Sequence, residues 1–311
     1  MKKKGQWKAW LYLAPALVLL AVFTVWPIIN TVRISLLKDY DGLSAVGGAS
    51  FEFGLSNFID VLNDPRSNGF FNCLGNTMLL CVATVPVSTM LALLIAVALN
   101  SIPFIRRTLQ TIFFLPYVTN SIAIGMVFMA MFSMVGTDMH NPESPGIINS
   151  IIMLFGGEKV NWVNAGSSKA ANMFVLMFYI VWNALPFKIL ILLGGLQSVN
   201  KQYYDAAKVD GTSRVRTFWK ITVPLLSPMI AYVVITGFIG GFKEYSSVVG
   251  IFGEEMGPVG DPGRLNTMVG LVYDSITNNQ GEASAAALIL FVIIFIVTMI
   301  NMYVSKKRVH Y

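Results

Sequence analysis

Charged residues are scarce in this sequence. Asp, Glu, Lys and Arg make up 12% of its 311 residues, about half of the share found in an ordinary soluble domain. In contrast, 55% of the residues are hydrophobic, and they gather in long runs. A helix needs roughly 20 such residues to cross about 30 Å of hydrocarbon. The composition therefore excludes an ordinary soluble fold and predicts several membrane spans.

Cysteine and histidine are also rare, which removes two kinds of site. The only cysteines, Cys73 and Cys81, are eight positions apart, and on one helix this spacing leaves about 12 Å between their α-carbons, too far for a disulfide. The two histidines, His140 and His310, belong to no His-x-x-x-His pattern and no cysteine cluster. We therefore expect no disulfide and no metal site.

Nucleotide and nucleic-acid motifs are missing as well. The sequence contains no Gly-x-x-x-x-Gly-Lys-Ser/Thr phosphate loop, so this chain is not expected to bind or hydrolyse ATP. Its net charge is +6, but the basic residues stand in short clusters beside apolar runs, without the interleaved aromatic residues that stack on bases. Binding to nucleic acid is therefore not expected.

Six apolar segments are present, and all should be helices, because the bilayer offers no water to an open backbone and the runs lack the alternation of barrel strands. The predicted spans are 11–36, 75–99, 111–135, 172–196, 225–252 and 283–304. The first run is far longer than a signal-peptide core and ends at Trp26-Pro27, so it is expected to be a retained anchor. No internal repeat or low-complexity tract is visible, and we expect 1–311 to form one membrane domain.

The distribution of Lys and Arg predicts the orientation, because these residues are retained on the cytoplasmic side. The N-terminal tail, the turn at Arg106 and Arg107, the segment 197–223 and the C-terminal tail together hold fourteen of them. The three alternate segments are longer but hold only five, together with thirteen of the sixteen acidic residues. Both termini are therefore predicted to be cytoplasmic, which agrees with an even number of spans.

The segment 197–223, between the fourth and fifth spans, is expected to form two short helices. Residues 203–209 include good helix formers, and Gly211 can adopt the backbone angles that end a helix. A second helix should then run to Pro224, which breaks it at the membrane surface. The paired Ala206 and Ala207 would let another protein approach the backbone closely. An amphipathic loop lying on lipid headgroups is the alternative.

This segment resembles the cytoplasmic motif of membrane subunits in binding-protein-dependent ABC importers. That motif reads Glu-Ala-Ala, three residues, Gly, nine residues, Ile, one residue, Leu-Pro. The sequence places Asp205-Ala206-Ala207, Gly211, Ile221 and Val223-Pro224 at those spacings, with Asp for Glu and Val for Leu. The resemblance implies coupling helices that dock on an ATPase subunit. The expected ATPase-coupling residues are Tyr204, Asp205, Ala206, Ala207, Asp210, Gly211, Phe218, Ile221 and Pro224.

The flanking segments are similar to the sugar-importing branch, in particular the first-type subunit of maltose and multiple-sugar permeases. They are 182–187, Phe242-Lys243 and 281–285. The resemblance implies an all-α, polytopic type I importer permease fold in the bacterial cytoplasmic membrane. It also implies four kinds of partner, namely a second homologous permease, two ATPase subunits that use ATP and Mg, an extracellular solute-binding protein, and a carbohydrate. The chain itself would be a non-catalytic subunit that binds no cofactor and contacts membrane lipid.

The resemblance implies that the third, fourth and fifth spans line the translocation path, with Tyr117, Ser121, Phe187 and Glu244 near its substrate contacts. Polar and aromatic residues inside these spans are candidates for the path, since ionisable groups in a membrane are costly and sugars need hydrogen-bonding groups beside aromatic rings. The expected substrate path comprises Tyr117, Ser121, Trp182, Asn183, Phe187, Gly240, Lys243, Glu244 and Tyr245. For each aromatic residue, the alternative is ordinary helix packing or a place in an interfacial aromatic belt. For Lys188 we expect the long side chain to extend toward the membrane interface.

Three alternative functions stay open at this point. An ion-coupled transporter or channel would need acidic residues in several spans, whereas Glu244 is the only acid deep in one. A membrane-embedded enzyme lacks candidate metal ligands. An ABC importer for amino acids, phosphate or metal would share the motif of 205–224 but not the sugar-like flanks.

Overall fold

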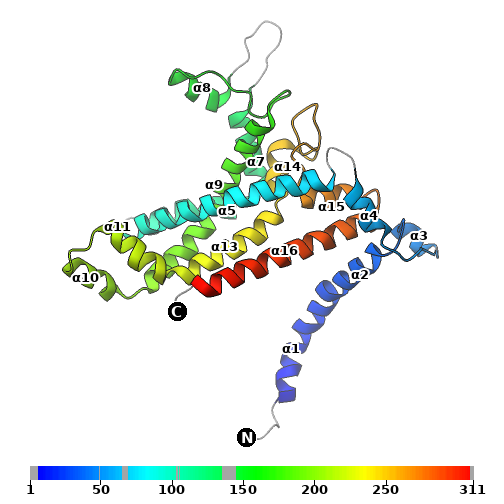
Figure 1. Ribbon diagram of the computed structural model, residues 1–311, viewed down its shortest axis with the longest axis horizontal. Helices are drawn as coiled ribbons and strands as arrows, with labels where there is room; N and C mark the ends of the chain where they lie inside the picture. The colour runs from blue at the N-terminus through cyan, green and yellow to red at the C-terminus, as the bar shows by residue number, and fades with distance from the viewer. Residues whose placement is uncertain are drawn as a thin grey trace. The chain divides into compact units, whose positions relative to one another are not determined.

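The computed structural model describes residues 6–48, 50–64, 69–102, 104, 106–134 and 145–308 (Figure 1). In these ranges the regular structure is helical, apart from one isolated bridge between Leu37 and Phe53. The helical segments, with η for π-helix, are α1 (Gln6–Leu20), η1 (Ala21–Val25), α2 (Trp26–Ser35), α3 (Gly42–Val46), α4 (Ser56–Asn63), α5 (Phe70–Asn100), α6 (Arg106–Val118), α7 (Ser121–Phe132), α8 (Gly146–Leu154), α9 (Lys169–Ser198), α10 (Lys201–Val209), α11 (Arg214–Thr217), η2 (Phe218–Thr222), α12 (Val223–Leu225), α13 (Ser227–Phe242), α14 (Ser246–Phe252), α15 (Met268–Ile276) and α16 (Gln280–Arg308).

The chain divides into two compact units, one made of 1–70 and 271–292 and the other of 71–270 and 293–311. In the first unit, the buried Asn57 of α4 donates to the carbonyl oxygens of Ser35 and Leu37, at 3.0 and 2.9 Å, and so fixes α4 to the end of α2. The second unit holds the cavity and the loop between α9 and α13 that are described below. The single membrane domain expected from the sequence stays a prediction.

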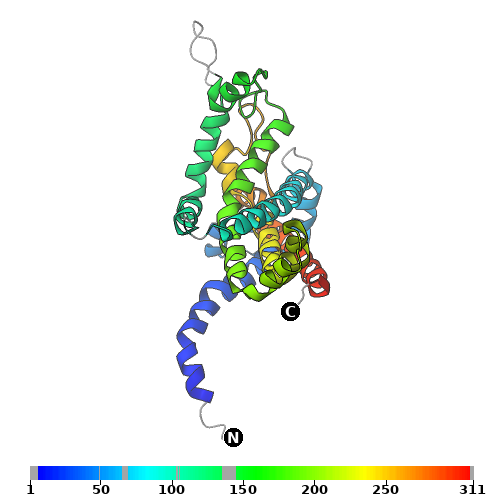
Figure 2. The same ribbon diagram turned by 90° about the vertical axis from the view of Figure 1, so that its left-hand side faces the viewer.

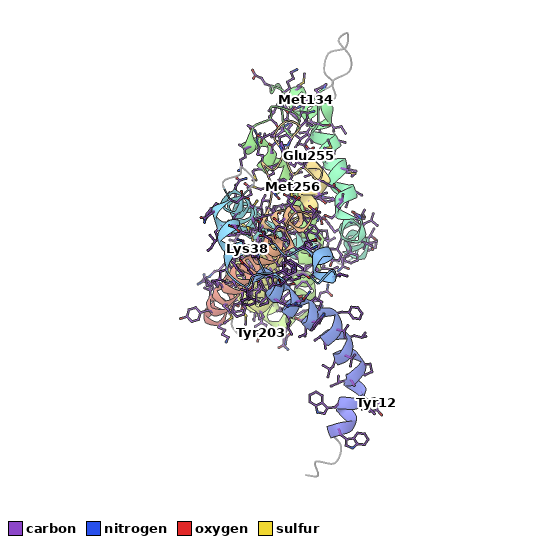
Figure 3. The ribbon with its side chains drawn as sticks, turned by 90° about the vertical axis from the view of Figure 1, so that its right-hand side faces the viewer. Tyr12, Lys38, Met134, Tyr203, Glu255 and Met256 are labelled. Carbon is purple, nitrogen blue, oxygen red and sulfur yellow. The ribbon has the colours of Figure 1, made fainter. Side chains whose placement is uncertain are left out.

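The number of spans agrees with the sequence analysis. Among the described residues, four helices are long and apolar enough to cross a membrane, namely Trp10–Ser35, Phe70–Asn100, Lys169–Ser198 and Gln280–Lys306, and the number is six when each of two bent helix pairs is taken as one span. The first of them has no buried residue in its most apolar stretch, and its aromatic side chains, such as Tyr12, point outward (Figure 3). This exposure suits a helix surrounded by lipid.

The third span is not the continuous helix predicted for 111–135. α6 and α7 meet at a bend of 101°, and Figure 2 shows α7 rising steeply from the end of α6. The side chain of Asn120 accepts hydrogen bonds from the backbone of Ile122 and Ala123 and thereby starts a new helix. Pro116, four residues earlier, lacks a backbone N–H and makes the end of α6 easier to break.

The fifth span also differs from the continuous helix predicted for 225–252. α13 ends at Phe242, and a short non-helical turn separates it from α14. Gly240 and Gly241, which weaken a helix, accept the backbone N–H groups of Lys243 and Glu244 in a tightened last turn. At the other end, the bend of 69° lies at Leu226 rather than at Pro224, because a proline is tolerated in the first turn of a helix.

Two apolar core clusters of the second unit meet on α9. The first packs α9 against α7 and α14 and includes Phe128, Tyr179 and Val248. The second packs α9 against α5 and the start of α13 and includes Leu192 and Leu226. α9 is therefore the central helix that positions the others.

Glycines allow the closest helix contacts in this unit. An added Cβ at Gly125 of α7 would lie 2.7 Å from the α-carbon of Gly250 in α14, and one at Gly241 of α13 would lie 2.7 Å from the sulfur of Cys81 in α5. Both Cys73 and Cys81 are buried within the helix packing of this unit.

The contact of Gly125 with Gly250 gives a testable prediction for stability. In Gly125→Ala the new methyl group meets backbone, which cannot rotate away, so we expect a loss of about 1–3 kcal/mol and a lower melting temperature of the purified protein in detergent. The control is Gly194→Ala, because Gly194 lies in α9 with no atom near its missing Cβ and alanine favours a helix. Equal melting temperatures for Gly125→Ala and the unaltered protein would contradict the assigned contact.

Candidate functional site

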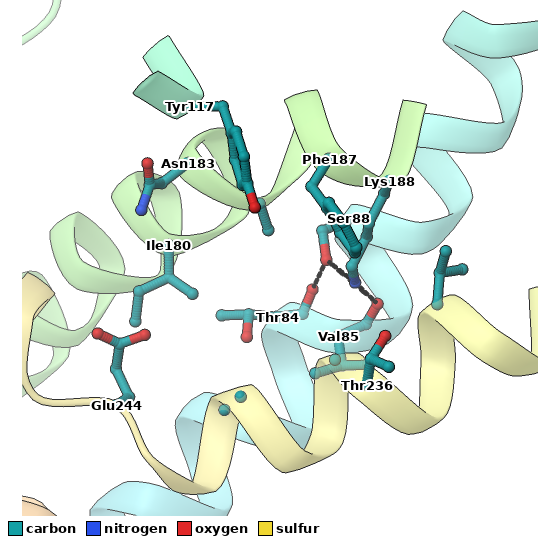
Figure 4. A pocket seen from close by; sticks show the side chains of 15 residues that line it. Thr84, Val85, Ser88, Tyr117, Ile180, Asn183, Phe187, Lys188, Thr236 and Glu244 are labelled. Carbon is teal, nitrogen blue, oxygen red and sulfur yellow. Dashed lines mark hydrogen bonds between the residues drawn. The ribbon is translucent and has the colours of Figure 1, made fainter. Parts of the chain in front are cut away.

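A cavity of about 290 Å³ lies between α5, α6, α9, α13 and the turn that follows α13 (Figure 4). It is lined by Thr84, Val85, Ser88, Tyr117, Ile180, Asn183, Ala184, Phe187, Lys188, Val233, Thr236, Gly237, Gly240, Gly241 and Glu244. Because these residues come from the second to fifth spans, the cavity is assembled by tertiary packing of membrane helices.

One wall of the cavity is aromatic. Tyr117 of α6 and Phe187 of α9 stack with ring centroids 5.8 Å apart and an angle of 19° between the rings. Half of the surface of Tyr117 is exposed, so part of its ring is available to contact a molecule in the cavity. The pair presents flat apolar surface with a phenol hydroxyl at its edge, which is an arrangement that binds molecules with both apolar and polar faces.

The other walls carry hydrogen-bonding groups. Thr84, Asn183 and Thr236 bring hydroxyl and amide groups from three helices. The Glu244 carboxyl group points toward the cavity (Figure 4), and one of its oxygens accepts the backbone N–H of Ser247 at 3.1 Å. The turn is held in place because the Thr267 hydroxyl donates to the Glu244 carbonyl at 2.8 Å.

Lys188 is buried, which corrects the expectation that it extends to the membrane interface. Only 4% of its surface is exposed. Its ammonium group donates to Ser88 Oγ at 2.7 Å, Thr89 Oγ1 at 2.9 Å and the Val85 carbonyl at 3.2 Å. All three N–H groups of the ammonium are therefore paired with oxygens of α5. This pairing offsets the desolvation cost of burying the charge, and it joins α9 to α5 beside the cavity.

A second polar cluster fixes the bend between α6 and α7. The Tyr179 hydroxyl donates to the Ser121 carbonyl at 2.5 Å and lies 2.9 Å from Ser121 Oγ. The side-chain amide of Asn183 donates to Ser121 Oγ at 3.3 Å. Since Tyr179 and Asn183 belong to α9, the first residue of α7 is tied to the central helix. Asn183 thus connects the bend to the cavity wall.

The structure brings together part of the predicted substrate path. Tyr117, Asn183, Phe187, Gly240 and Glu244 line the cavity. The remaining four lie elsewhere in the described structure: Ser121 bonds to Tyr179 at the bend, Trp182 and Tyr245 pack against the core cluster of α7, α9 and α14, and Lys243 is exposed after α13. The roles of all nine stay predictions.

Several lining residues were absent from the sequence-based selection. Thr84 and Ser88 lie four positions apart on α5, in the second span, which was not considered as part of the path. Their spacing places them on one helix face, so polar residues at i and i+4 within an apolar run are the signal that could have found them. Thr236 and Gly237 carry no comparable signal.

The loop between α9 and α13 contains the two expected helices. α10 ends at Val209, and Gly211 follows with φ of +65°, in the left-handed region that glycine favours. Ala206 is exposed but Ala207 is buried, so only the first of the paired alanines leaves room for an approaching surface. The Tyr204 hydroxyl lies 3.4 Å from Thr222 Oγ1 and links α10 to η2.

The predicted coupling residues fall into two groups. Those accessible at the surface are Asp205, Ala206, Asp210 and Gly211, whereas Tyr204, Ala207, Phe218, Ile221 and Pro224 are partly or fully buried. Phe218 packs against the core cluster of α5, α9 and α13. The first group is therefore the part of the predicted coupling motif that is accessible to another protein.

Residues 74–311 match the family of binding-protein-dependent transport system inner membrane components. The chain belongs to this family. The match begins in α5 and includes every element of the cavity and of the loop between α9 and α13, so both features are parts of an inner membrane component of a transport system. The chain is thus a multi-pass inner membrane protein.

Individual relatives resemble this inner membrane component over nearly its whole length. The arabinooligosaccharides transport system permease protein AraP of Bacillus subtilis is 30% identical over 300 residues, which cover 95% of this chain and 88% of AraP. The lactose transport system permease protein LacF of Rhizobium radiobacter is 27% identical over 316 residues, covering 99% and 97%. These relatives are permease proteins.

A solved structure has the same fold. A chain from the crystal structure of a bacterial ABC transporter involved in the import of the acidic polysaccharide alginate superimposes with a TM-score of 0.76, at 17% sequence identity, over 98% of this chain and 96% of the other. The all-α importer permease fold expected from the sequence is therefore confirmed.

Proposed function

We propose that this chain is a transmembrane subunit of an ATP-driven importer whose substrate is a carbohydrate. The observation that carries the proposal is the stacked pair of Tyr117 and Phe187 beside the hydroxyl, amide and carboxyl groups of Thr84, Asn183 and Glu244. A pyranose ring has apolar C–H faces and a rim of hydroxyl groups. The aromatic wall suits the faces, and the polar walls suit the rim. The names of AraP and LacF, which concern sugars, support the same class of substrate.

The proposal includes the partners that supply energy and substrate. A second homologous permease would complete the pore, two ATPase subunits would bind ATP and Mg, and an extracellular binding protein would deliver the sugar. The chain itself would be non-catalytic and hold no cofactor. Both termini and α10 would face the cytoplasm, in line with the excess of basic residues in those segments.

The path from α10 to the cavity suggests how ATPase movement reaches the substrate. α10 contacts η2 through Tyr204 and Thr222. From η2 the chain runs through α12 into α13, which lines the cavity with Thr236 and Gly237. A push on α10 would therefore move α13, with the bend at Leu226 as the flexible point. Such motion would open the cavity alternately to the two sides of the membrane.

Substitution of the aromatic wall tests the carbohydrate proposal. In Tyr117→Ala, loss of roughly 60 Å² of apolar contact at about 25 cal/mol per Å² removes about 1.5 kcal/mol of binding energy, so the sugar concentration for half-maximal uptake should rise roughly tenfold. Uptake of labelled oligosaccharides is measured in proteoliposomes that contain the importer purified through a tag on this chain. Tyr232→Ala is the control, because Tyr232 is an exposed tyrosine of α13 outside the cavity.

The result has two informative outcomes. A weaker apparent affinity in Tyr117→Ala, with normal uptake in Tyr232→Ala, supports a sugar contact at this wall. Unchanged uptake kinetics in both variants would remove the aromatic pair from the substrate path. Absence of uptake for every neutral or acidic sugar by the unaltered importer would contradict the carbohydrate assignment itself.

A further inference from the structure

α8 presents an apolar face that no described residue covers. Its exposed large side chains are Ile147 (56% exposed), Ile151 (49%), Met153 (50%) and Leu154 (81%), and Phe155 (85%) follows directly. The sequence 145–157 contains no charged residue. Such a contiguous patch is unfavourable in water, since each exposed large apolar side chain forgoes about 1.5–3 kcal/mol of burial energy. A contiguous exposed patch of this kind marks a site of contact with a membrane or with another protein.

The helix is held rigidly by its opposite face. The buried side chain of Asn149 donates to the Val160 carbonyl at 2.9 Å and accepts from the Val160 N–H at 3.1 Å and the Trp162 indole N–H at 3.0 Å. These three bonds use both ends of the amide. These contacts fix the orientation of α8, so its apolar face is exposed because of the way the helix is held and not because the segment is loosely attached.

The position of α8 at the end of a span is also fixed. Gly146, the first residue of α8, has φ of +68°, and an added Cβ there would collide with the carbonyl oxygen of Ser133, the residue that follows α7. Figure 1 shows α8 lying across the end of α7 rather than continuing along it. α7 is the second half of a bent candidate span, so α8 begins directly beyond the end of that span.

We propose that α8 is an interfacial helix whose exposed face is inserted into the membrane leaflet at this end of α7, in contact with lipid acyl chains. The bilayer already surrounds the spans of this inner membrane protein, so this surface continues an existing interface. The exposed face of α7, with Met126 at 59% and Val127 at 57%, is apolar in the same way.

Two features favour lipid over a protein as the occupant. The patch consists of isoleucine, leucine, methionine and phenylalanine side chains and lacks charge across 145–157, whereas a protein interface usually also carries arginine or tyrosine. The charged residues begin immediately afterwards with Glu158 and Lys159, both exposed. A segment at the boundary between acyl chains and headgroups buries apolar side chains in the acyl region and keeps charged ones among the headgroups.

Nitroxide labels test this proposal. Ile151→Cys, Leu154→Cys and Phe155→Cys are labelled one at a time in the intact importer reconstituted in lipid nanodiscs, and collision rates with oxygen and with a water-soluble nickel chelate are measured. Oxygen concentrates in acyl chains and the chelate in water. The native Cys73 and Cys81 have no exposed surface, so they need no replacement. Met126→Cys on α7 is the lipid control, and Val259→Cys, 77% exposed in the loop between α14 and α15, is the water control.

For a helix in the leaflet, the three labels should resemble Met126→Cys, with oxygen collisions several-fold more frequent than nickel collisions. Labels that resemble Val259→Cys would overturn the proposal, because the face would then be in water. Labels protected from both reagents would also overturn it, because a protein partner would then cover the face. Uptake by each cysteine variant confirms that it is folded.

Discussion

Replacement of Gly211 by aspartate is expected to abolish ATP-driven uptake while the protein still inserts and folds. Gly211 has φ of +65° and no atom within 4 Å of its missing Cβ, so a new side chain projects away from the chain and does not disturb the core. Aspartate tolerates the left-handed region better than most residues. The loss of uptake would therefore come from a charged group placed on the surface proposed to dock on the ATPase.

Gly166→Asp is the matched control for this substitution. Gly166, in the loop before α9, has φ of +74° and also lacks neighbours within 4 Å of its missing Cβ, so the backbone cost is similar. Uptake in proteoliposomes should fall at least tenfold in Gly211→Asp and stay near normal in Gly166→Asp. Normal transport by Gly211→Asp would refute the assigned role of the loop between α9 and α13. Equal losses in both variants would attribute the effect to backbone strain.

Removal of one acceptor from the buried Lys188 should cost more stability than removal of the lysine itself. Ser88→Ala leaves the ammonium with two of its three oxygens, and a hydrogen bond to a charged group contributes about 1.5–3 kcal/mol. In Lys188→Met the hydroxyl groups keep other partners, because Ser88 donates to the Thr84 carbonyl at 2.6 Å and Thr89 to the Val85 carbonyl at 2.7 Å. This second change should be nearly neutral.

The double variant provides the control. Ser88→Ala combined with Lys188→Met should be about as stable as Lys188→Met alone, which corresponds to a coupling energy of about 2 kcal/mol between the two positions. Unfolding of all four proteins is followed in the same detergent. Additive losses in the double variant, or a larger loss in Lys188→Met than in Ser88→Ala, would contradict the account of Lys188 as a charge that is stable only because α5 solvates it.

Features that depend on neighbouring residues in the chain were predicted from the sequence. The spans follow from run length, since every backbone polar group in a membrane must be satisfied within its own helix. The end of α10 just before Gly211 follows from the backbone freedom of glycine. The spacing from Asp205 to Pro224 carried the resemblance to importer subunits, and the match of residues 74–311 to that family confirmed it.

Prolines and glycines indicated weak points in the spans without specifying their outcome. Pro116 and Gly241 can be found in the sequence of the third and fifth spans. Whether a helix kinks gently or breaks at such a residue depends on which groups replace the lost backbone hydrogen bonds. At the α6–α7 bend, that replacement comes from the side chain of Asn120 and from the contacts of Ser121 with Tyr179. The latter residue is 58 positions away, so the sequence of the span alone could not indicate a bend of 101°.

The sequence by itself determined that the chain crosses the membrane about six times, that it carries an importer motif between the fourth and fifth spans, and which residue types could meet a sugar. Only the tertiary structure decided that Tyr117 faces Phe187, that Lys188 is solvated by α5 instead of reaching the interface, and that Thr84 and Ser88 belong to the cavity. The physical reason is that lipid and protein are almost equally apolar. Hydrophobicity therefore predicts that a helix lies in the membrane but not which of its faces meets another helix, a cavity or lipid, and that choice depends on close packing and on hydrogen bonds between distant residues.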